Sequence, residues 1–76
     1  AYYSSGFYER ALISMNFLIK QEPNNPQFYF TRASIEANLG RTSAAIADLR
    51  KVIEINPEAK GQIEPMIQQV RAGKTI

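Results

Sequence analysis

Two segments of the chain carry the same pattern of apolar residues. Within each segment they stand at positions i, i+1, i+4, i+7 and i+8, which lie on one face of an α-helix. The matching pairs, all 34 positions apart, are Ala11 and Ala45, Leu12 and Ile46, Met15 and Leu49, Leu18 and Val52, and Ile19 and Ile53. The pattern therefore predicts one helix that occurs twice at a fixed offset, which is the mark of an internal repeat.

Proline and glycine follow the same offset. Pro23 and Pro57 are 34 positions apart, and so are Gly6 and Gly40. These breaks predict helices over about residues 8–22, 27–39, 42–55 and 62–72, with the glycines at helix ends. The run of three aromatic residues at 28–30 is too short for a strand and leads into helix-forming residues, so the predicted fold class is all-α.

The helix ends also carry local signals. Pro26 suits the first position of a helix, where its missing N–H group has no cost. Gly40 suits the left-handed conformation that closes a helix, and Thr42 or Ser43 is expected to cap the next one. Residues 26–57 are therefore expected to form a helix, a tight turn and an antiparallel helix.

A helical hairpin that repeats at this offset with small residues at fixed places resembles the tetratricopeptide repeat. The matching residues include Tyr29 at a bulky position and Ala33 and Ala45 at small ones. The full set is Ala11, Met15, Leu18, Pro23, Tyr29, Ala33, Gly40, Ala45, Leu49, Val52 and Pro57. The resemblance implies antiparallel hairpins stacked as a fragment of a right-handed superhelix, in which the two alanines allow close helix packing.

The resemblance divides the chain, expected to be one domain over residues 1–76, into three parts. Residues 1–23 correspond to a partial repeat, residues 26–57 to a complete repeat, and residues 60–72 to a capping helix. The cap departs from the repeat pattern because Ile67 stands at a small position and Pro65 lies inside the helix. Its remaining side chains are polar on one side, as expected for a terminal helix.

The complete repeat departs from the pattern at two positions that are usually apolar, Arg32 and Glu36. Similar repeats with arginine at this place carry aspartate in the second helix, where this chain has Asp48. The resemblance thus implies an ion pair between Arg32 and Asp48. The alternative is that Arg32 extends into solvent with its aliphatic part over Ala45.

The first repeated helix lacks most of the partner helix that would cover its apolar face. Exposing several large apolar side chains costs about 1.5 to 3 kcal/mol for each one. We therefore expect this face to be covered by a preceding repeat or by association between copies of the chain. The chain begins with Ala rather than Met, which suggests a piece of a longer protein.

In the family that the chain resembles, the first helices of the repeats line a concave groove that binds a peptide or a helix of a partner. The positions that match this groove are Tyr3, Gln27, Phe30, Ser34, Ala37, Asn38, Glu64, Gln68 and Arg71. For Phe30 the alternative is packing against a neighbouring repeat, and for Asn38 it is a role at the helix end. A clamp for a partner's C-terminal carboxylate is not matched, because Phe30 and Thr31 stand where that clamp has Lys and Asn.

Composition excludes most catalytic chemistry. The chain has neither Cys nor His, which removes thiolate and imidazole metal sites, cysteine nucleophiles and the usual general base. Its carboxylates show no pairing that would bring two of them into one site, and its glycines form no phosphate-binding loop. We therefore expect no enzyme activity, no cofactor and no metal.

The formal charge of +2 indicates neither a nucleic-acid nor a membrane partner. The favoured function is a non-catalytic scaffold that binds a protein or peptide partner. The alternative is self-association into a homo-oligomer. An RNA-binding helical repeat is disfavoured, because those repeats prefer a slightly longer period and a basic groove.

Overall fold

The computed structural model describes the backbone of residues 2–76 and the side chains from residue 6 onward. This part of the chain forms four α-helices: α1 (Tyr2–Gln21), α2 (Pro26–Asn38), α3 (Thr42–Ile55) and α4 (Lys60–Arg71). A short 3-10 helix, η1 (Pro57–Ala59), precedes the last of them. The described residues contain no strand, so the predicted all-α fold is confirmed.

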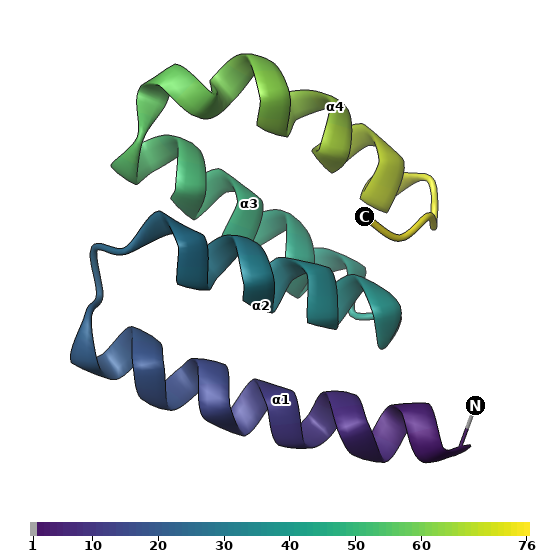
Figure 1. The fold of residues 1–76 in the computed structure, drawn as a ribbon. Coiled ribbons are helices and arrows are strands. Elements are labelled where there is room, and N and C mark those ends of the chain that lie inside the picture. Colours follow the sequence, from purple (N-terminus) through teal and green to yellow (C-terminus); the bar gives the residue numbers. More distant parts are fainter. Residues whose placement is uncertain (1) are drawn as a thin grey trace.

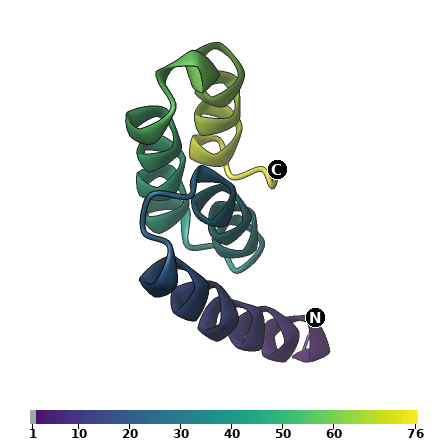
Figure 2. The ribbon, with the colours of Figure 1, turned by 60° about the vertical axis from the view of Figure 1, so that its left-hand side comes forward.

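Each helix packs against the next one along the chain, α1 on α2, α2 on α3 and α3 on α4 (Figure 1). Consecutive helices run in opposite directions and form hairpins. The view in Figure 2 places α2 and α4 on the same side of α3. The Cα atoms span 36 × 32 × 14 Å, so the array is a thin slab in which every helix retains a solvent-facing side.

The core lies between α2, α3 and α4. Ala33 on α2 and Ala45 and Leu49 on α3 expose none of their surface. The other buried members of this cluster are Tyr29, Val52, Ile63, Ile67 and Val70. Because alanine side chains are short, the backbones of α2 and α3 can approach closely while larger residues fill the space on either side.

The internal repeat is visible in the burial pattern. α1 ends at Gln21 and α3 ends at Ile55, so the two helix ends are separated by the same offset as the repeated residues. The buried residues of α2 and α4 also match at this offset, as Tyr29 with Ile63, Ala33 with Ile67, and Glu36 with Val70. α4 therefore turns toward α3 the face that corresponds to the buried face of α2.

The apolar face of α1 is only partly covered. Leu12 is buried, and Ile19 packs at the edge of the core. Ala11, Met15 and Leu18 are less well covered than the equivalent residues of α3, which are 5% exposed or less. Further large apolar side chains of α1 are exposed, with Phe7, Ile13 and Phe17 showing 69%, 70% and 61% of their surface.

Two of the predicted helix ends form as expected. Asn25 caps α2 by accepting a hydrogen bond of 3.0 Å from the Gln27 N–H, and Pro26 is the first helical residue. At the other end, Gly40 adopts a φ of 78°. The Gly40 N–H donates to the Ala37 carbonyl and the Arg41 N–H to the Glu36 carbonyl, which is the bonding pattern of a Schellman motif.

Three predictions of helix ends are wrong. α1 begins at Tyr2 rather than near residue 8, so Gly6 lies inside the helix, and Gly61 likewise lies inside α4. A single glycine costs a helix only about 1 kcal/mol and does not end it. No side chain caps α3, which starts at Thr42 directly after the Gly40 turn. That turn leaves neither Thr42 nor Ser43 in the flanking position where a cap residue stands.

The two glycines Gly40 and Gly6 give a matched test of this turn. Gly40→Ala should lower the free energy of unfolding by about 1 to 2 kcal/mol, because an L-residue is strained at positive φ. Gly6→Ala should raise it by about 0.5 to 1 kcal/mol, because Gly6 is helical and an added Cβ would meet nothing within 4 Å. Chemical denaturation measures both, and equal effects would contradict the assigned backbone conformations.

Candidate functional site

Arg32 is the centre of a polar cluster that joins three helices. Its Nε and one terminal nitrogen donate to the two carboxylate oxygens of Asp48 on α3, at 2.8 and 2.7 Å. The other terminal nitrogen donates to Oδ1 of Asn16 on α1 at 2.9 Å. Arg32 and Asp48 thus form the two-pronged ion pair between α2 and α3, and the same side chain also holds α1.

Tyr29 lies beside this cluster and adds a second link to α1. Its hydroxyl donates a hydrogen bond of 2.8 Å to the Pro23 carbonyl, in the turn that follows α1. The guanidinium carbon of Arg32 is 5.6 Å from the centre of the Tyr29 ring, and the Lys51 ammonium nitrogen is 6.0 Å from it. The ring therefore lies within cation–π distance of positive groups from both α2 and α3.

Glu36 is an acid in an unusual environment, one turn after Arg32 on α2. The residue is 9% exposed, and its Oε1 is buried without a hydrogen-bond partner. Burial raises the pKa of Glu36 to about 8, and a hydrogen bond with the Asp48 carboxyl and the charge on that group act in the same direction. Arg32 and Arg41 oppose this shift. Glu36 is thus protonated at neutral pH and can donate to the Asp48 carboxylate.

The Arg32 cluster is structural in character. Its charges satisfy one another between packed helices, and none of its residues lines either of the grooves described below. The hydrogen bonds that Arg32 donates to Asp48 are the largest cause that raises the pKa of Arg32 above its already high usual value. The cluster therefore has a joining role rather than a substrate-binding one.

The first groove lies between α2 and α4 and has a volume of about 260 Å³. Gln27 and Phe30, two of the residues matched to the family's groove, line one wall from α2. Gln62 and Met66 of α4 line the opposite wall. The amide groups offer both donors and acceptors, and Phe30 and Met66 offer apolar surface. Phe30 is half-buried, so it packs on the core as well as lining this groove.

The other matched residues of α2 make local contacts. The Ser34 hydroxyl donates to the Ile76 carbonyl at 3.1 Å, so the end of the chain returns to α2. Asn38 donates to the Ser34 carbonyl at 2.9 Å, which is a contact within the helix, and Ala37 packs on the core. The side chain of Tyr3 lies outside the described residues.

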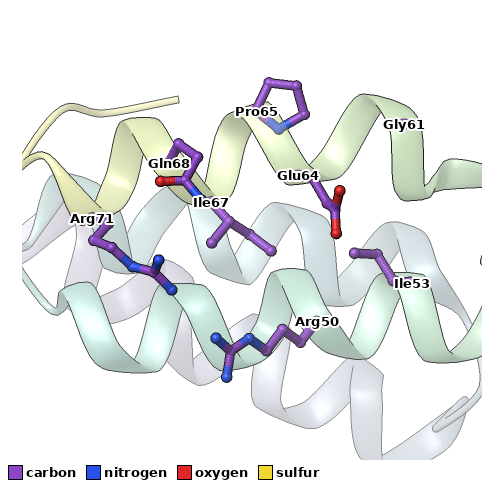
Figure 3. A pocket seen from close by; sticks show the side chains of 8 residues that line it. All are labelled: Arg50, Ile53, Gly61, Glu64, Pro65, Ile67, Gln68 and Arg71. Carbon is purple, nitrogen blue, oxygen red and sulfur yellow. The ribbon is translucent and has the colours of Figure 1, made fainter.

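The second groove lies between α3 and α4 and has a volume of about 530 Å³. Figure 3 shows the α4 residues Glu64, Gln68 and Arg71 here, together with Arg50 and Ile53 of α3. The structure thus separates these three matched residues from Gln27 and Phe30. Arg50 and Ile53 are not among the matched positions, because the family's groove pattern draws only on the first helix of each hairpin.

The part of the chain that the structure describes contains neither a candidate metal site nor a membrane-spanning helix. Its Asp and Glu side chains form no group of three that could hold a metal ion. No helix within residues 2–76 has the length and apolar character needed to cross a bilayer.

Comparison with known proteins identifies the family. A tetratricopeptide repeat profile matches residues 1–72, and the chain belongs to this family. Human tetratricopeptide repeat protein 13 is 38% identical over 52 residues, which cover 68% of this chain and 6% of that protein. The chain thus spans a small fraction of the length of this relative. No solved structure matches the chain.

The buried acid Glu36 makes the stability depend on pH. Its pKa is about 8 in the folded state against an ordinary value of 4.5, so the unfolded chain releases a proton that the folded chain keeps. The free energy of unfolding should therefore fall as pH rises from about 5 to 8, by about 1 to 2 kcal/mol after allowance for solvent screening. The chain has no His to titrate in this range.

Glu36→Gln retains a hydrogen-bond donor and cannot ionise. The free energy of unfolding of this variant should therefore fall much less between pH 5 and pH 8. Urea denaturation at pH 5 and pH 8 measures it. Glu54→Gln is the control, because it removes an exposed carboxylate 3.3 Å from Lys51. Its free energy of unfolding should fall with pH as much as that of the unchanged protein. A Glu36→Gln variant that keeps the full pH dependence would contradict a protonated Glu36.

Proposed function

We propose that the protein is a non-catalytic interaction module that holds a segment of a partner protein beside α2. Tetratricopeptide repeats are general protein–protein interaction modules, and this chain belongs to that family. The observation that carries the proposal is the placement of Ile76. Its carbonyl accepts a hydrogen bond from Ser34, while its side chain packs against the core. The surface beside α2 therefore accommodates a main-chain carbonyl and an aliphatic side chain from a non-helical segment.

The groove between α2 and α4 extends this surface. In the proposed role, Phe30 is the apolar anchor for the bound segment, and the amides of Gln27 and Gln62 bond to its main chain. An aromatic side chain in a partly desolvated pocket is the usual type of residue that dominates binding energy. The other matched residues, Tyr3, Glu64, Gln68 and Arg71, are proposed to contact a partner separately from this surface, because Glu64, Gln68 and Arg71 line the groove between α3 and α4.

The proposed organisation of the chain follows from the same repeat. Residues 1–23 are the end of one repeat, residues 26–57 a complete repeat, and residues 60–72 a cap. A partner segment would thus cross the complete repeat and reach the cap. No cofactor or metal is required, because contacts of this kind depend only on shape, apolar burial and hydrogen bonds.

Peptides selected from a random library for binding to the protein test the role of Phe30. Phe30→Ala should weaken the selected peptides about tenfold or more, because it removes the apolar anchor. Phe17→Ala is the matched control, since Phe17 is exposed on α1, away from the groove. Fluorescence anisotropy measures the affinities, with thermal unfolding to confirm that both variants fold. Peptides that lose affinity for the Phe17 variant alone would overturn the assignment.

Self-association is the second candidate function, and the surface of α1 favours it. Phe7, Ile13 and Phe17 expose most of their surface, and Met15 and Leu18 are only partly covered. Several exposed apolar side chains on one helix are typical of a protein contact. A second copy of the chain is one partner that could cover them.

Light scattering over a range of concentrations tests this second candidate. If α1 mediates association, the mass should rise toward that of a dimer with concentration, and Ile13→Ser with Phe17→Ser should return it to the monomer. Both side chains are exposed, so this double variant should retain its helices by circular dichroism. A monomer at every concentration would exclude self-association and leave these side chains to a different partner.

A further inference from the structure

After α4 the chain reverses direction and returns to α2 (Figure 1). Gly73 lies at the reversal and adopts a φ of 86°. Its N–H donates to the Val70 carbonyl and the Lys74 N–H donates to the Gln69 carbonyl, each at 2.9 Å, which is the pattern of a Schellman motif. Because glycine favours this backbone conformation, the sequence itself directs residues 73–76, here called the return segment, away from the axis of α4.

The return segment is held on α2 at its far end. The Ile76 carbonyl accepts a hydrogen bond of 3.1 Å from the Ser34 hydroxyl, and the Ile76 side chain packs against the core cluster. Lys74 and Thr75, which lie between the reversal and Ile76, are exposed. The return segment is thus attached at two points, by backbone hydrogen bonds at α4 and by one aliphatic side chain with one hydrogen bond at α2.

The attachment at α2 lies next to the groove between α2 and α4. Ser34 follows Phe30 by one turn on the same face of α2, and Phe30 lines the groove. An α-helix rises by about 1.5 Å per residue, so the two positions are about 6 Å apart along α2. An extended peptide covers that distance with about two residues. A partner segment that lies along α2 and passes Phe30 toward Ser34 would therefore reach the place of Ile76.

We propose that the return segment is an internal competitor, which a partner segment must displace from the surface beside α2. This inference rests on the proposed function, because it concerns the same surface. Both segments use the Ser34 hydroxyl and the apolar position that Ile76 fills, so they cannot be bound there at the same time. The return segment belongs to the same chain, so dilution of the protein does not weaken its competition.

The contacts of the return segment are few enough for a partner to release it. Ile76 is only partly buried, and a single side-chain hydrogen bond joins the segment to α2. The backbone entropy lost on ordering the segment offsets much of what these contacts contribute. The closed form is therefore favoured by a modest factor. The affinity for a partner is reduced by the same factor, because only the open form can bind it.

Peptides selected from a random library on the Ile76→Ser variant, which lacks the aliphatic contact, are the probe. Fluorescence anisotropy measures their affinity for the unchanged protein and for two release variants, Ile76→Ser and Gly73→Ala. In Gly73→Ala the added Cβ meets nothing within 4 Å, but an L-residue is strained at this φ. The effect of Gly73→Ala therefore comes from the reversal and not from a new contact with the peptide.

We expect both release variants to bind the peptides about three- to tenfold more tightly than the unchanged protein. Gly73→Asn is the matched control at the reversal, because asparagine tolerates positive φ. Thr75→Ala is the control within the segment, because it changes an exposed residue. Both controls should bind within about twofold of the unchanged protein, and thermal unfolding confirms that every variant folds.

Methyl NMR of the isoleucine side chains follows the return segment directly. The Ile76→Ser variant identifies the Ile76 resonance by its loss. When the unchanged protein is saturated with peptide, this resonance should move to the position of a solvent-exposed isoleucine. An Ile76 resonance that keeps its packed position in the complex would overturn the proposal, and so would release variants that bind no more tightly than the unchanged protein.

These results differ from those that would overturn the proposed function. If Phe30→Ala weakens the peptides while the release variants have no effect, the surface beside α2 stands and only the competition is excluded. If no peptide binds any variant, or if Phe30→Ala has no effect, the assigned surface is wrong. The return segment then has no partner to compete with, and both proposals fail.

Discussion

The close packing of α2 on α3 is the constraint on which the rest of the structure depends. Ala33 and Ala45 expose no surface, and both belong to the apolar cluster between α2, α3 and α4. A slab with a 14 Å extent in its thin direction can bury few side chains, so each of them must be well packed. A larger residue at either alanine would separate the hairpin and open the core to water.

The Arg32 cluster depends on that same packing. Only when α2 and α3 are close can Arg32 reach both oxygens of Asp48 and still hold Asn16 of α1. Removing several charged groups from water is costly, and here the cost is limited because Glu36 takes up a proton instead of adding a second negative charge. The cluster therefore joins three helices in one register and introduces a pH dependence into the stability.

The helices of the repeat differ in how they are covered. α2 packs against both α1 and α3, whereas α1 packs mainly on α2 and α4 mainly on α3. The open side of α1 is apolar and that of the α3 and α4 groove is rich in charge. These two surfaces therefore differ in chemistry. The surface beside α2, where Ile76 lies against Ser34, is a third and separate region.

The sequence by itself determined the helical repeat and most helix boundaries. The spacing of apolar residues defines which face of a helix is buried, and Asn25, Pro26 and Gly40 act through local backbone geometry. The same spacing placed Ala45 on a buried face, and the resemblance to the tetratricopeptide repeat implied an interior place for Ala33. The prediction that Gly6 lies at a helix end was wrong, because the free-energy cost of one glycine is too small to end a long helix.

Only the tertiary structure decided the chemistry of the surfaces. The protonation of Glu36 depends on how deeply α3 buries it and on the distance to Asp48, neither of which follows from spacing. Likewise, Arg50 and Arg71 lie in one groove, whereas the matched residue Gln27 lies in a different groove from Arg71. Such sets combine side chains from helices far apart in sequence, so the packing of the helices, and not any local pattern, brings them together.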